Sequence, residues 1–343
     1  MPTNYYDPKY LRGSIVKIQP ERLFFRHRFF SESVTFPTKT VTFEFARNSR
    51  RLLPYATDYG GSVPIDRNAY QAHTFTAPLI SGSRAITPDT LSMKLLGEAP
   101  YNSGMSPEDR ARDLAAQDLV ELTEALYRQE EYMCARLKQD GKLDIDTDGL
   151  SATVDYGFTN IENVTGANKW TSTYDILGKL AKMARELRKN GVNPDTLIVG
   201  ADVAEAINQN EGVLKLRHDQ FVDIPKPDSL EDGITFVCQL RAPGIYVNVL
   251  EYDEYYEDKD GNLQPLIDPK TVIMQSSRER NIMLHGAVTY LDPRTNDYVT
   301  DMSEYCPYVV SSYDPPVRKL IVSSRVLPMP RDIESWLVLK NAV

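Results

Sequence analysis

The longest regular pattern of apolar positions in the 343-residue chain runs through residues 106–139. Ser106 and Pro107 form a typical helix start, because a serine side chain caps free backbone N–H groups and proline fits the first helical position. Apolar side chains then recur at helical spacing until Gly141. They are Ala111, Ala115, Leu119, Leu122, Leu126, Met133 and Leu137. The pattern predicts one amphipathic helix over 106–139, roughly 50 Å long at about 1.5 Å per residue, lying across a sheet.

The segments on either side of this helix have a strand pattern. Residues 34–46 alternate between apolar and polar positions, which predicts a strand with one buried face. Residues 47–100 are punctuated by glycines and prolines and contain no long periodic stretch, so we expect a long, protruding β-hairpin rather than a compact fold. Residues 143–158 alternate on both sides of Asp148-Gly149, which predicts a second hairpin with its turn there.

The remainder of the chain predicts an α/β unit followed by a β-rich region. A helix is expected to begin at Thr173 and to stop at Gly191, followed by a short buried strand at 196–200 and a short helix at 201–209. Strands dominate after residue 232. We expect them at 233–239, 244–252, 271–275, 282–290, 319–328 and 336–340, with a turn at 258–262. The fold class is therefore α+β.

An aromatic cluster near the N-terminus has two interpretations. Leu23, Phe24, Phe25, Phe29 and Phe30 alternate with arginines inside the first 30 residues. One interpretation is a short buried helix. The other is an extended arm that anchors on a neighbouring subunit. The sequence leaves both open.

Composition and charge exclude several classes of protein. The chain is 41% hydrophobic, enough for one large or two ordinary cores, and its net charge is −9. A free-standing nucleic-acid binder usually carries a basic excess, because its affinity comes largely from neutralising phosphates. The N-terminus lacks an apolar signal core, so we expect assembly in the cytoplasm and no contact with a membrane. Three widely spaced cysteines favour free thiols over a disulfide framework or a zinc site.

One constellation resembles a metal site. Asp144, Asp146 and Asp148 with Gly149, and Asp155 in the twelfth place, match most of an EF-hand calcium loop. However, the twelfth ligand is too short for the usual bidentate glutamate, and the residues after Gly149 alternate like a strand. Asp258-Lys259-Asp260-Gly261-Asn262 is likewise typical of a hairpin turn. We therefore expect a hairpin and no metal.

Enzyme signatures are absent from the sequence. It contains no nucleotide-binding, zinc-protease or serine-hydrolase motif. The four histidines, His27, His73, His218 and His285, are scattered without metal-ligand spacing. We expect no catalytic residue, no cofactor and no metal ligand.

The order of the predicted parts resembles the shell-forming fold of tailed-bacteriophage major capsid proteins, specifically the lambda-type major capsid protein E family. Six stretches carry the resemblance, which extends over nearly the whole chain. They are Leu52–Pro78 and Ile86–Leu91, similar to the family's extended loop; Glu121–Gly141, similar to the end of its spine helix; Gly141–Gly157, similar to the hairpin after it; Trp170–Asp175, similar to the entry to the axial domain; and Arg318–Ala342, similar to the strand that returns to the peripheral domain.

The resemblance implies an architecture and a role. It divides the chain into an N-terminal arm with the first strand (1–46), an extended loop (47–100), a peripheral domain (101–165 and 311–343) with the spine helix, and an axial domain (166–310). It implies a structural protein of the virion that assembles into hexamers and pentamers of an icosahedral shell around double-stranded DNA, without sequence-specific DNA binding. Scaffold, portal and decoration proteins are the implied partners.

Two alternatives from other classes remain at this point. One is an encapsulin-type compartment that encloses cargo enzymes, which gene neighbours would distinguish. The other is a soluble α/β enzyme with a metal at Asp144, Asp146 and Asp155, which metal content would decide.

Charge patterning adds an expectation about assembly. The extended loop carries a net charge of +2 and the spine helix −3, so we expect the loop to bind a neighbouring subunit rather than its own. The basic residues of the loop are Arg47, Arg50, Arg51, Arg67, Arg84 and Lys94.

Overall fold

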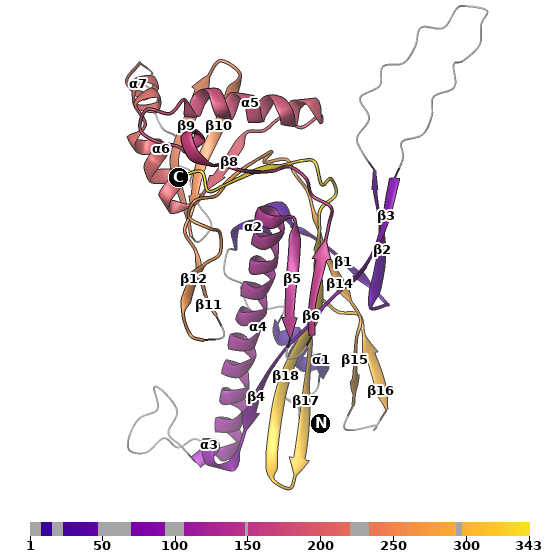
Figure 1. Ribbon diagram of the computed structural model, residues 1–343. Coiled ribbons are helices and arrows are strands. Elements are labelled where there is room, and N and C mark those ends of the chain that lie inside the picture. Colours follow the sequence, from indigo (N-terminus) through magenta and orange to yellow (C-terminus); the bar gives the residue numbers. More distant parts are fainter. Residues whose placement is uncertain are drawn as a thin grey trace, which may run out of the picture.

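The computed structural model describes residues 8–15, 23–46, 70–92, 106–147, 150–219, 233–258, 260–292 and 297–343. Two sheets and one long helix, α4 (Pro107–Asp140), organise these residues (Figure 1). Short helices add to this frame: α1 (Pro8–Ile15), α2 (Phe24–Phe29) and α3 (Pro88–Ser92). The mixture of helices and strands confirms the predicted α+β class.

The spine helix α4 forms as its sequence predicts. The Ser106 hydroxyl accepts a hydrogen bond from the Asp109 N–H at 3.1 Å, and Pro107 is the first helical residue. The helix ends at Gly141, which has a left-handed backbone with φ 66° and donates its N–H to the carbonyl of Leu137. Glycine adopts this conformation at little cost, which explains the sharp stop. The predicted helix is confirmed, with both of its ends one residue later than expected.

A five-stranded sheet lies against α4. Its path runs β1–β14–β18–β17, and β4 pairs with another part of the long strand β18. The strands are β1 (Glu32–Phe36), β4 (Leu79–Ile86), β14 (Ile282–Gly286), β17 (Cys306–Tyr313) and β18 (Pro316–Met329).

A six-stranded sheet forms the other half of the frame, in the order β7–β19–β13–β8–β10–β9. The helices α5 (Ile176–Lys189), α6 (Ala201–Gln209) and α7 (Glu211–Asp219) pack beside it. The strands are β7 (Ile161–Asn163), β8 (Thr196–Val199), β9 (Ile234–Ala242), β10 (Ile245–Tyr252), β13 (Val272–Gln275) and β19 (Leu337–Lys340). The predicted second helix begins at Ile176, not at Thr173, because Asp175 caps it by accepting the Gly178 N–H.

In the described part of the chain, four two-stranded ribbons extend from this frame. The expected hairpin after the spine helix is among them, with Thr147 paired to Leu150 across the turn. The ribbons are β2 (Thr40–Ala46) with β3 (Tyr70–Thr76), β5 (Lys142–Thr147) with β6 (Leu150–Asp155), β11 (Tyr255–Glu257) with β12 (Leu263–Pro265), and β15 (Val288–Leu291) with β16 (Tyr298–Asp301).

The prediction of one strand over 34–46 is wrong. The segment forms two strands: β1 runs parallel to β14, and β2 pairs with β3. Pro37 follows β1 directly, and a proline has no backbone N–H to continue a ladder.

The prediction that all of residues 47–100 protrude is also wrong. Strand β4 pairs with β18 of the same chain, from Leu79 opposite Arg325 to Ile86 opposite Arg318. The ribbon β2–β3 instead begins at Thr40, before the predicted loop. Residues 47–69 and 93–105 lie outside the described residues.

The sheets also divide the chain differently from the predicted domain boundaries. Strand β14, within the predicted axial segment 166–310, belongs to the five-stranded sheet beside β18. Strand β19, within the predicted peripheral segment 311–343, belongs to the six-stranded sheet between β7 and β13. Both strands satisfy their ladders by long-range pairing, which the local pattern does not encode.

Replacing Gly141 tests the helix stop. A Cβ there would lie 2.4 Å from the Cβ of Phe158, on a backbone with positive φ. We expect Gly141→Ala to lower the free energy of unfolding by about 3 kcal/mol or more, because backbone strain and overpacking each cost about 1–3 kcal/mol. Urea titration measures this loss. Gly157→Ala is the matched control, because its φ is 73° but a Cβ would meet nothing within 4 Å. Equal losses of stability for the two variants would show that the steric clash of the added Cβ with Phe158 contributes nothing.

Candidate assembly surfaces

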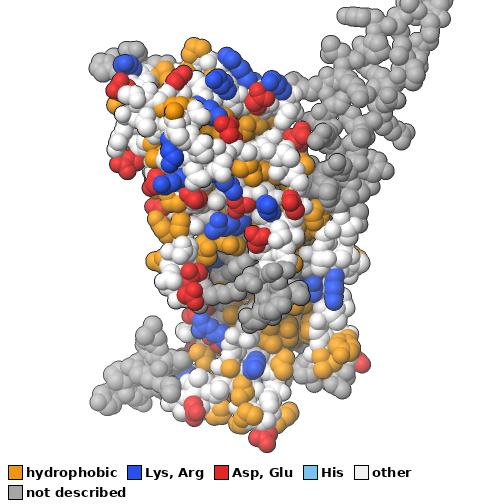
Figure 2. All heavy atoms as spheres, viewed as in Figure 1, with side chains coloured by type: hydrophobic (Ala, Val, Ile, Leu, Met, Phe, Trp, Pro, Cys, Tyr) orange, Lys and Arg blue, Asp and Glu red, His pale blue; other side chains and the backbone are white. Residues whose placement is uncertain are grey.

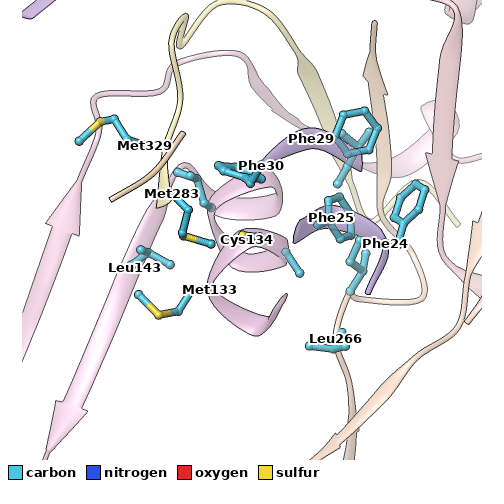
Figure 3. Close-up of a cluster of buried hydrophobic side chains, with 14 of the residues drawn as sticks. Phe24, Phe25, Phe29, Phe30, Met133, Cys134, Leu143, Leu266, Met283 and Met329 are labelled. Carbon is cyan, nitrogen blue, oxygen red and sulfur yellow. The ribbon is translucent and has the colours of Figure 1, made fainter. Parts of the chain in front are cut away.

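Helix α2 is buried against the spine helix within the same subunit. Phe24, Phe25, Phe29 and Phe30 are fully buried beside the C-terminal part of α4, where Cys134 contributes to the same core (Figure 3). The rings of Phe24 and Phe25 meet edge to face with centroids 5.0 Å apart, a favourable geometry for aromatic pairs. Of the two interpretations of this cluster, the short buried helix is therefore confirmed.

A carboxylate of α4 supplies the missing cap of α2. Leu23 precedes α2 and offers no side-chain acceptor, so the first N–H groups of the helix need another partner. The N–H groups of Phe25 and Arg26 each donate to Glu131 at 2.8 Å, and the Tyr252 hydroxyl donates to it at 3.0 Å. Burial raises the pKa of Glu131 to about 7, although the three donors act in the opposite direction.

The neighbouring Glu130 connects α2 to the strand β17. The Arg26 Nε donates to Glu130 at 3.0 Å, and the hydroxyl of Tyr305, directly before β17, donates at 2.8 Å. Arg26 also donates to the carbonyl of Phe30 and to the Ser33 hydroxyl. Burial raises the pKa of Glu130, opposed by the charge of Arg26.

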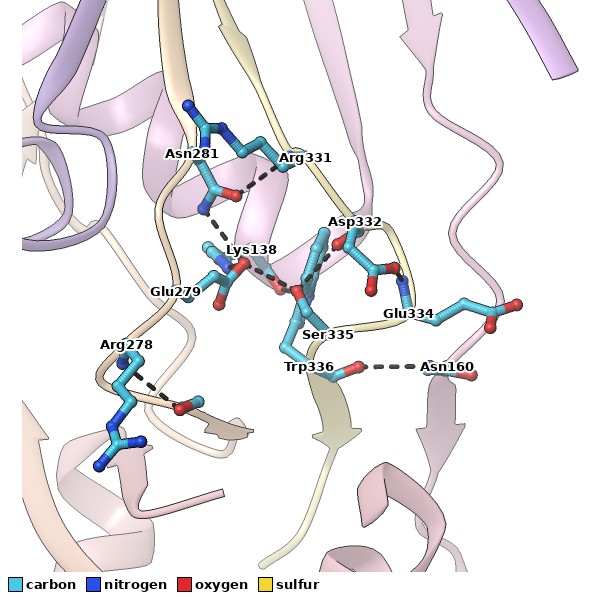
Figure 4. Close-up of polar contacts among 11 residues, drawn as sticks. Lys138, Asn160, Arg278, Glu279, Asn281, Arg331, Asp332, Glu334, Ser335 and Trp336 are labelled. Carbon is cyan, nitrogen blue, oxygen red and sulfur yellow. Dashed lines mark hydrogen bonds and ion pairs between the residues drawn. The ribbon is translucent and has the colours of Figure 1, made fainter. Parts of the chain in front are cut away.

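A second buried ion pair is formed by Lys138, which lies two residues before the end of α4. Its Nζ lies 2.5 Å from Glu279 Oε1 and 4.1 Å from the centroid of the Trp336 ring, which donates its Nε1–H to the Lys138 carbonyl (Figure 4). The same Glu279 oxygen accepts from the hydroxyl of Ser335 and the amide of Asn281. Burial lowers the pKa of Lys138, and Glu279 opposes that shift.

This ion pair lies where the chain crosses between the two sheets. Glu279 is in the connection from β13 to β14, and Ser335 is in the connection from β18 to β19. The spine helix is thus joined to both crossings through one carboxylate. A cleft of about 550 Å³ opens beside them. It is lined by Gly191, Val192, Asn193, Asp195, Ser276, Arg278, Glu279, Arg280, Asn281, Arg331, Asp332 and Ser335.

The aspartates of the calcium-like motif lie on the hairpin β5–β6. Asp144 accepts a hydrogen bond from the Thr153 hydroxyl at 2.7 Å, and Asp155 accepts the Gly157 N–H at 2.8 Å. The side chain of Asp146 and the whole of Asp148 lie outside the described residues. Within the described part of the chain, no group of three or more His, Cys, Asp or Glu is arranged to hold a metal ion. The predicted hairpin is confirmed, and no EF-hand helix follows it.

The histidines and cysteines do not come together. His27 is exposed, His285 is buried, and the side chains of His73 and His218 lie outside the described residues. Burial, helped by the charge of Arg26, lowers the pKa of His285 to about 3, so its ring is neutral at physiological pH. The three cysteines are buried free thiols. In the described part of the chain, no helix has the length and apolar character needed to span a membrane.

Comparison with known proteins identifies the family. The sequence matches the family model described as phage major capsid protein E over residues 7–341. The chain belongs to this family. It is therefore a structural, shell-forming protein of the virion and not an enzyme.

Solved structures agree on the fold. A protein from E. coli CFT073, described as the capsid protein of a prophage, has a TM-score of 0.69 at 18% identity, covering 96% of each chain. A phage-related protein from Bordetella bronchiseptica RB50 has a TM-score of 0.54 at 11% identity, covering 98% of this chain and 97% of its own. No curated protein matches the sequence.

The ribbon β2–β3 of the capsid protein belongs to neither of the two large sheets. Strands β2 and β3 pair over seven positions, from Thr40–Thr76 to Ala46–Tyr70, and project from the body (Figure 1). Its base is fixed: the buried Phe75 ring stacks on Tyr156 with centroids 5.2 Å apart, and the Tyr156 hydroxyl donates to the Pro328 carbonyl. A fixed base gives the projecting end a defined direction.

Part of the predicted charge complementarity is satisfied inside the subunit. Arg84, on β4, forms ion pairs with Asp118 at 3.5 Å and with Glu121, both on the spine helix. Arg84 therefore finds its acidic partners within its own subunit and not on a neighbouring one, because β4 lies over α4 of the same chain. The other basic residues of the predicted loop, Arg47, Arg50, Arg51, Arg67 and Lys94, lie outside the described residues.

Large apolar side chains are exposed at three hairpins of the capsid protein. Tyr313 at the end of β17 is 95% exposed, Tyr298 on β16 80%, and Leu263 on β12 72%. Orange hydrophobic side chains are visible at the lower end of the body, where the β17–β18 hairpin lies (Figure 2). Tyrosine, which supplies two of these three side chains, is enriched at interfaces between proteins.

The raised pKa of Glu131 predicts a pH dependence of stability. The folded subunit holds this proton more tightly than the unfolded chain, since the pKa rises from 4.5 to about 7. The resulting stabilisation is complete below pH 4.5 and is lost as the pH rises to 7, by up to roughly 3 kcal/mol. Urea unfolding of the unassembled subunit from pH 4.5 to 8 should show this decline, and Glu131→Gln should flatten it. The exposed Glu108→Gln is the control for removing a carboxylate from the same helix. Parallel profiles for wild type and Glu131→Gln would contradict the assignment.

The Lys138–Glu279 pair predicts strong coupling between two substitutions. Lys138→Met leaves a buried carboxylate without its cation and should cost about 3–5 kcal/mol of unfolding free energy. The double variant Lys138→Met/Glu279→Gln should recover most of that loss, because no unpaired buried charge remains. A double-mutant cycle of urea unfolding measures the coupling. If the stability losses of Lys138→Met and Glu279→Gln simply add in the double variant, the two side chains do not interact directly.

Proposed function

We propose that the protein assembles into hexamers and pentamers that close an icosahedral shell around double-stranded DNA. The family match over residues 7–341 carries this proposal. The subunit geometry supports it, because a shell needs parts that reach beyond the subunit's own core. The ribbon β2–β3 and the exposed hairpin ends are such parts.

The parts of the subunit have separate roles in this proposal. The ribbon β2–β3 reaches over a neighbouring subunit as the described part of the extended loop. The spine helix and the five-stranded sheet form the peripheral domain. The six-stranded sheet with α5, α6 and α7 forms the axial domain, which faces the symmetry axis of the capsomer.

The acidic composition supports a container that does not bind its contents tightly. With a net charge of −9, the chain as a whole repels the phosphates of nucleic acid rather than neutralising them. We therefore propose that DNA is enclosed without sequence-specific contacts. Assembly takes place in the cytoplasm of the host cell, with scaffold, portal and decoration proteins as partners.

Electron microscopy of the purified, expressed protein tests the proposal. We expect closed shells built from five-fold and six-fold capsomers, and particles from the natural source should contain DNA. Particles that instead hold a cargo enzyme would identify an encapsulin-type compartment. Protein that stays monomeric under all assembly conditions, with scaffold present, would contradict the proposal.

Shortening the ribbon tests its proposed role. Ala46 and Tyr70 are directly opposite each other, so a two-residue Asn-Gly turn in place of residues 47–69 closes the hairpin without changing its register. We expect a soluble subunit with unchanged melting temperature that forms no closed shells, measured by light scattering and microscopy. A Gly/Ser segment of the original length is the control that separates reach from specific contact. Normal shells from the shortened variant would refute the role.

A further inference from the structure

An acidic hairpin projects beside the spine helix. The segment 253–265, which contains the ribbon β11–β12, carries five acidic residues and one lysine, a net charge of −4. Glu257 and Asp260 are exposed, and neither side chain has an ion pair within the described part of the chain. This is a concentrated charge on a small projecting element.

The hairpin is held in one orientation. Tyr256 faces the spine helix, where its ring meets that of Tyr132 with centroids 4.8 Å apart. Because neighbouring residues of a strand point to opposite faces, Tyr255 and Glu257 face outward. The turn is fixed by Asp258, whose carboxylate accepts the N–H groups of Asp260 and Asn262 at 2.9 Å each. The acidic and apolar side chains on the outer face are therefore presented in a defined geometry.

Two arginines without an ion-pair partner among the described residues lie at the cleft between the sheets. Arg278 and Arg280 line it and are exposed, and no partner of either guanidinium is found among the described residues. The third arginine of the lining, Arg331, is paired with Glu32 at 2.6 Å. Positive charge is thus available at the cleft.

The acidic residues of the same cleft are already engaged. Asp195 accepts from the N–H and the hydroxyl of Ser277 at 2.6 Å each. Glu279 is paired with Lys138, and Asp332 accepts the backbone N–H of Glu334 at 2.9 Å. Among the charged side chains of the lining, Arg278 and Arg280 are therefore the ones without a partner in the described part of the chain, which favours an incoming carboxylate over an incoming cation.

The hairpin and the strand that follows the two arginines lie on different sides of the spine helix. In Figure 1, β11 and β12 lie to the left of α4, whereas the connection 276–281 leads into β14 on the right. A subunit with complementary patches on two sides can contact identical copies head to tail, and such contacts close into rings when the rotation allows it.

We propose that the acidic hairpin β11–β12 of one copy docks at the Arg278–Arg280 side of the cleft in the next copy of a capsomer ring. Glu257 and Asp260 provide the carboxylates, and the outward Leu263 and Tyr255 are covered by the same contact. This interface rests on the shell-forming role of the protein and assigns a specific surface to it. Because the charges are exposed, the contact guides orientation and partner choice and weakens with salt.

A charge swap tests the interface. In Glu257→Lys/Asp260→Lys, and separately in Arg278→Glu/Arg280→Glu, like charges would oppose each other. We expect each variant to keep the melting temperature of the wild-type subunit and to lose at least about tenfold in shell yield at low salt. Combining all four substitutions restores opposite charges across the interface. The combined variant should assemble to within about twofold of wild type.

A matched control separates the contact from net charge. Asp202→Lys/Glu205→Lys changes two exposed acids on α6, far along the chain from the hairpin. Added to Arg278→Glu/Arg280→Glu, it restores the net charge but should not restore shells. Full assembly by either charge-reversed double variant would overturn the proposed interface. So would a failure of the variant with all four substitutions to recover shell formation. Absence of shells from wild-type protein would instead count against the shell-forming function itself.

Discussion

The burial of charged side chains on the spine helix is the constraint on which the rest of the structure depends. Glu130, Glu131 and Lys138 are fully buried, and an unpaired charge in that position costs several kcal/mol. Their partners come from segments more than 100 residues away in the sequence, including Arg26, Tyr252, Tyr305 and Glu279. The buried charges of α4 therefore find all their partners only when α2, both sheets and the connections between the sheets are in place together.

This constraint also positions the two charged surfaces that we propose to meet between subunits. The crossings that meet at Glu279 and Ser335 form the walls of the arginine-lined cleft, so its geometry follows from the ion pair with Lys138. On the other side of α4, Tyr256 holds the acidic hairpin against the helix through Tyr132. The core thus determines where the complementary charges are presented.

The sequence predicts the parts of this fold that depend on local chemistry. The cap at Ser106, the apolar stripe and Gly141 define α4, and alternation defines the hairpin that follows. The order of these parts was sufficient for the family resemblance, which the match over residues 7–341 confirms. The pairing of strand β4 could not be predicted, because its partner β18 is more than 200 residues away in the sequence. The pattern also does not show that a Cβ on Gly82 would lie only 3.0 Å from Leu122 Cδ2.

The buried charges were visible in the sequence but not interpretable from it alone. Glu130 falls at helical spacing between Leu126 and Met133, inside the apolar stripe, where a solvated charge is not expected. Such a position signals a buried partner without identifying it. Arg26 could be recognised as that partner only once α2 was packed on α4. The acidic segment 253–265 was likewise visible in the sequence, whereas the cleft opposite it requires three connections to meet.

Amide hydrogen exchange of the free subunit and of the assembled shell tests the central claim most directly. The account states that the core around Glu130, Glu131 and Lys138 is complete in each subunit, and that assembly engages the projecting parts. It predicts that amides of α2 and of the C-terminal half of α4 are protected to the same degree in both states, while β2–β3 and β11–β12 gain protection only in the shell. Rapid exchange of α2 and α4 in the free subunit, with protection appearing only on assembly, would contradict it.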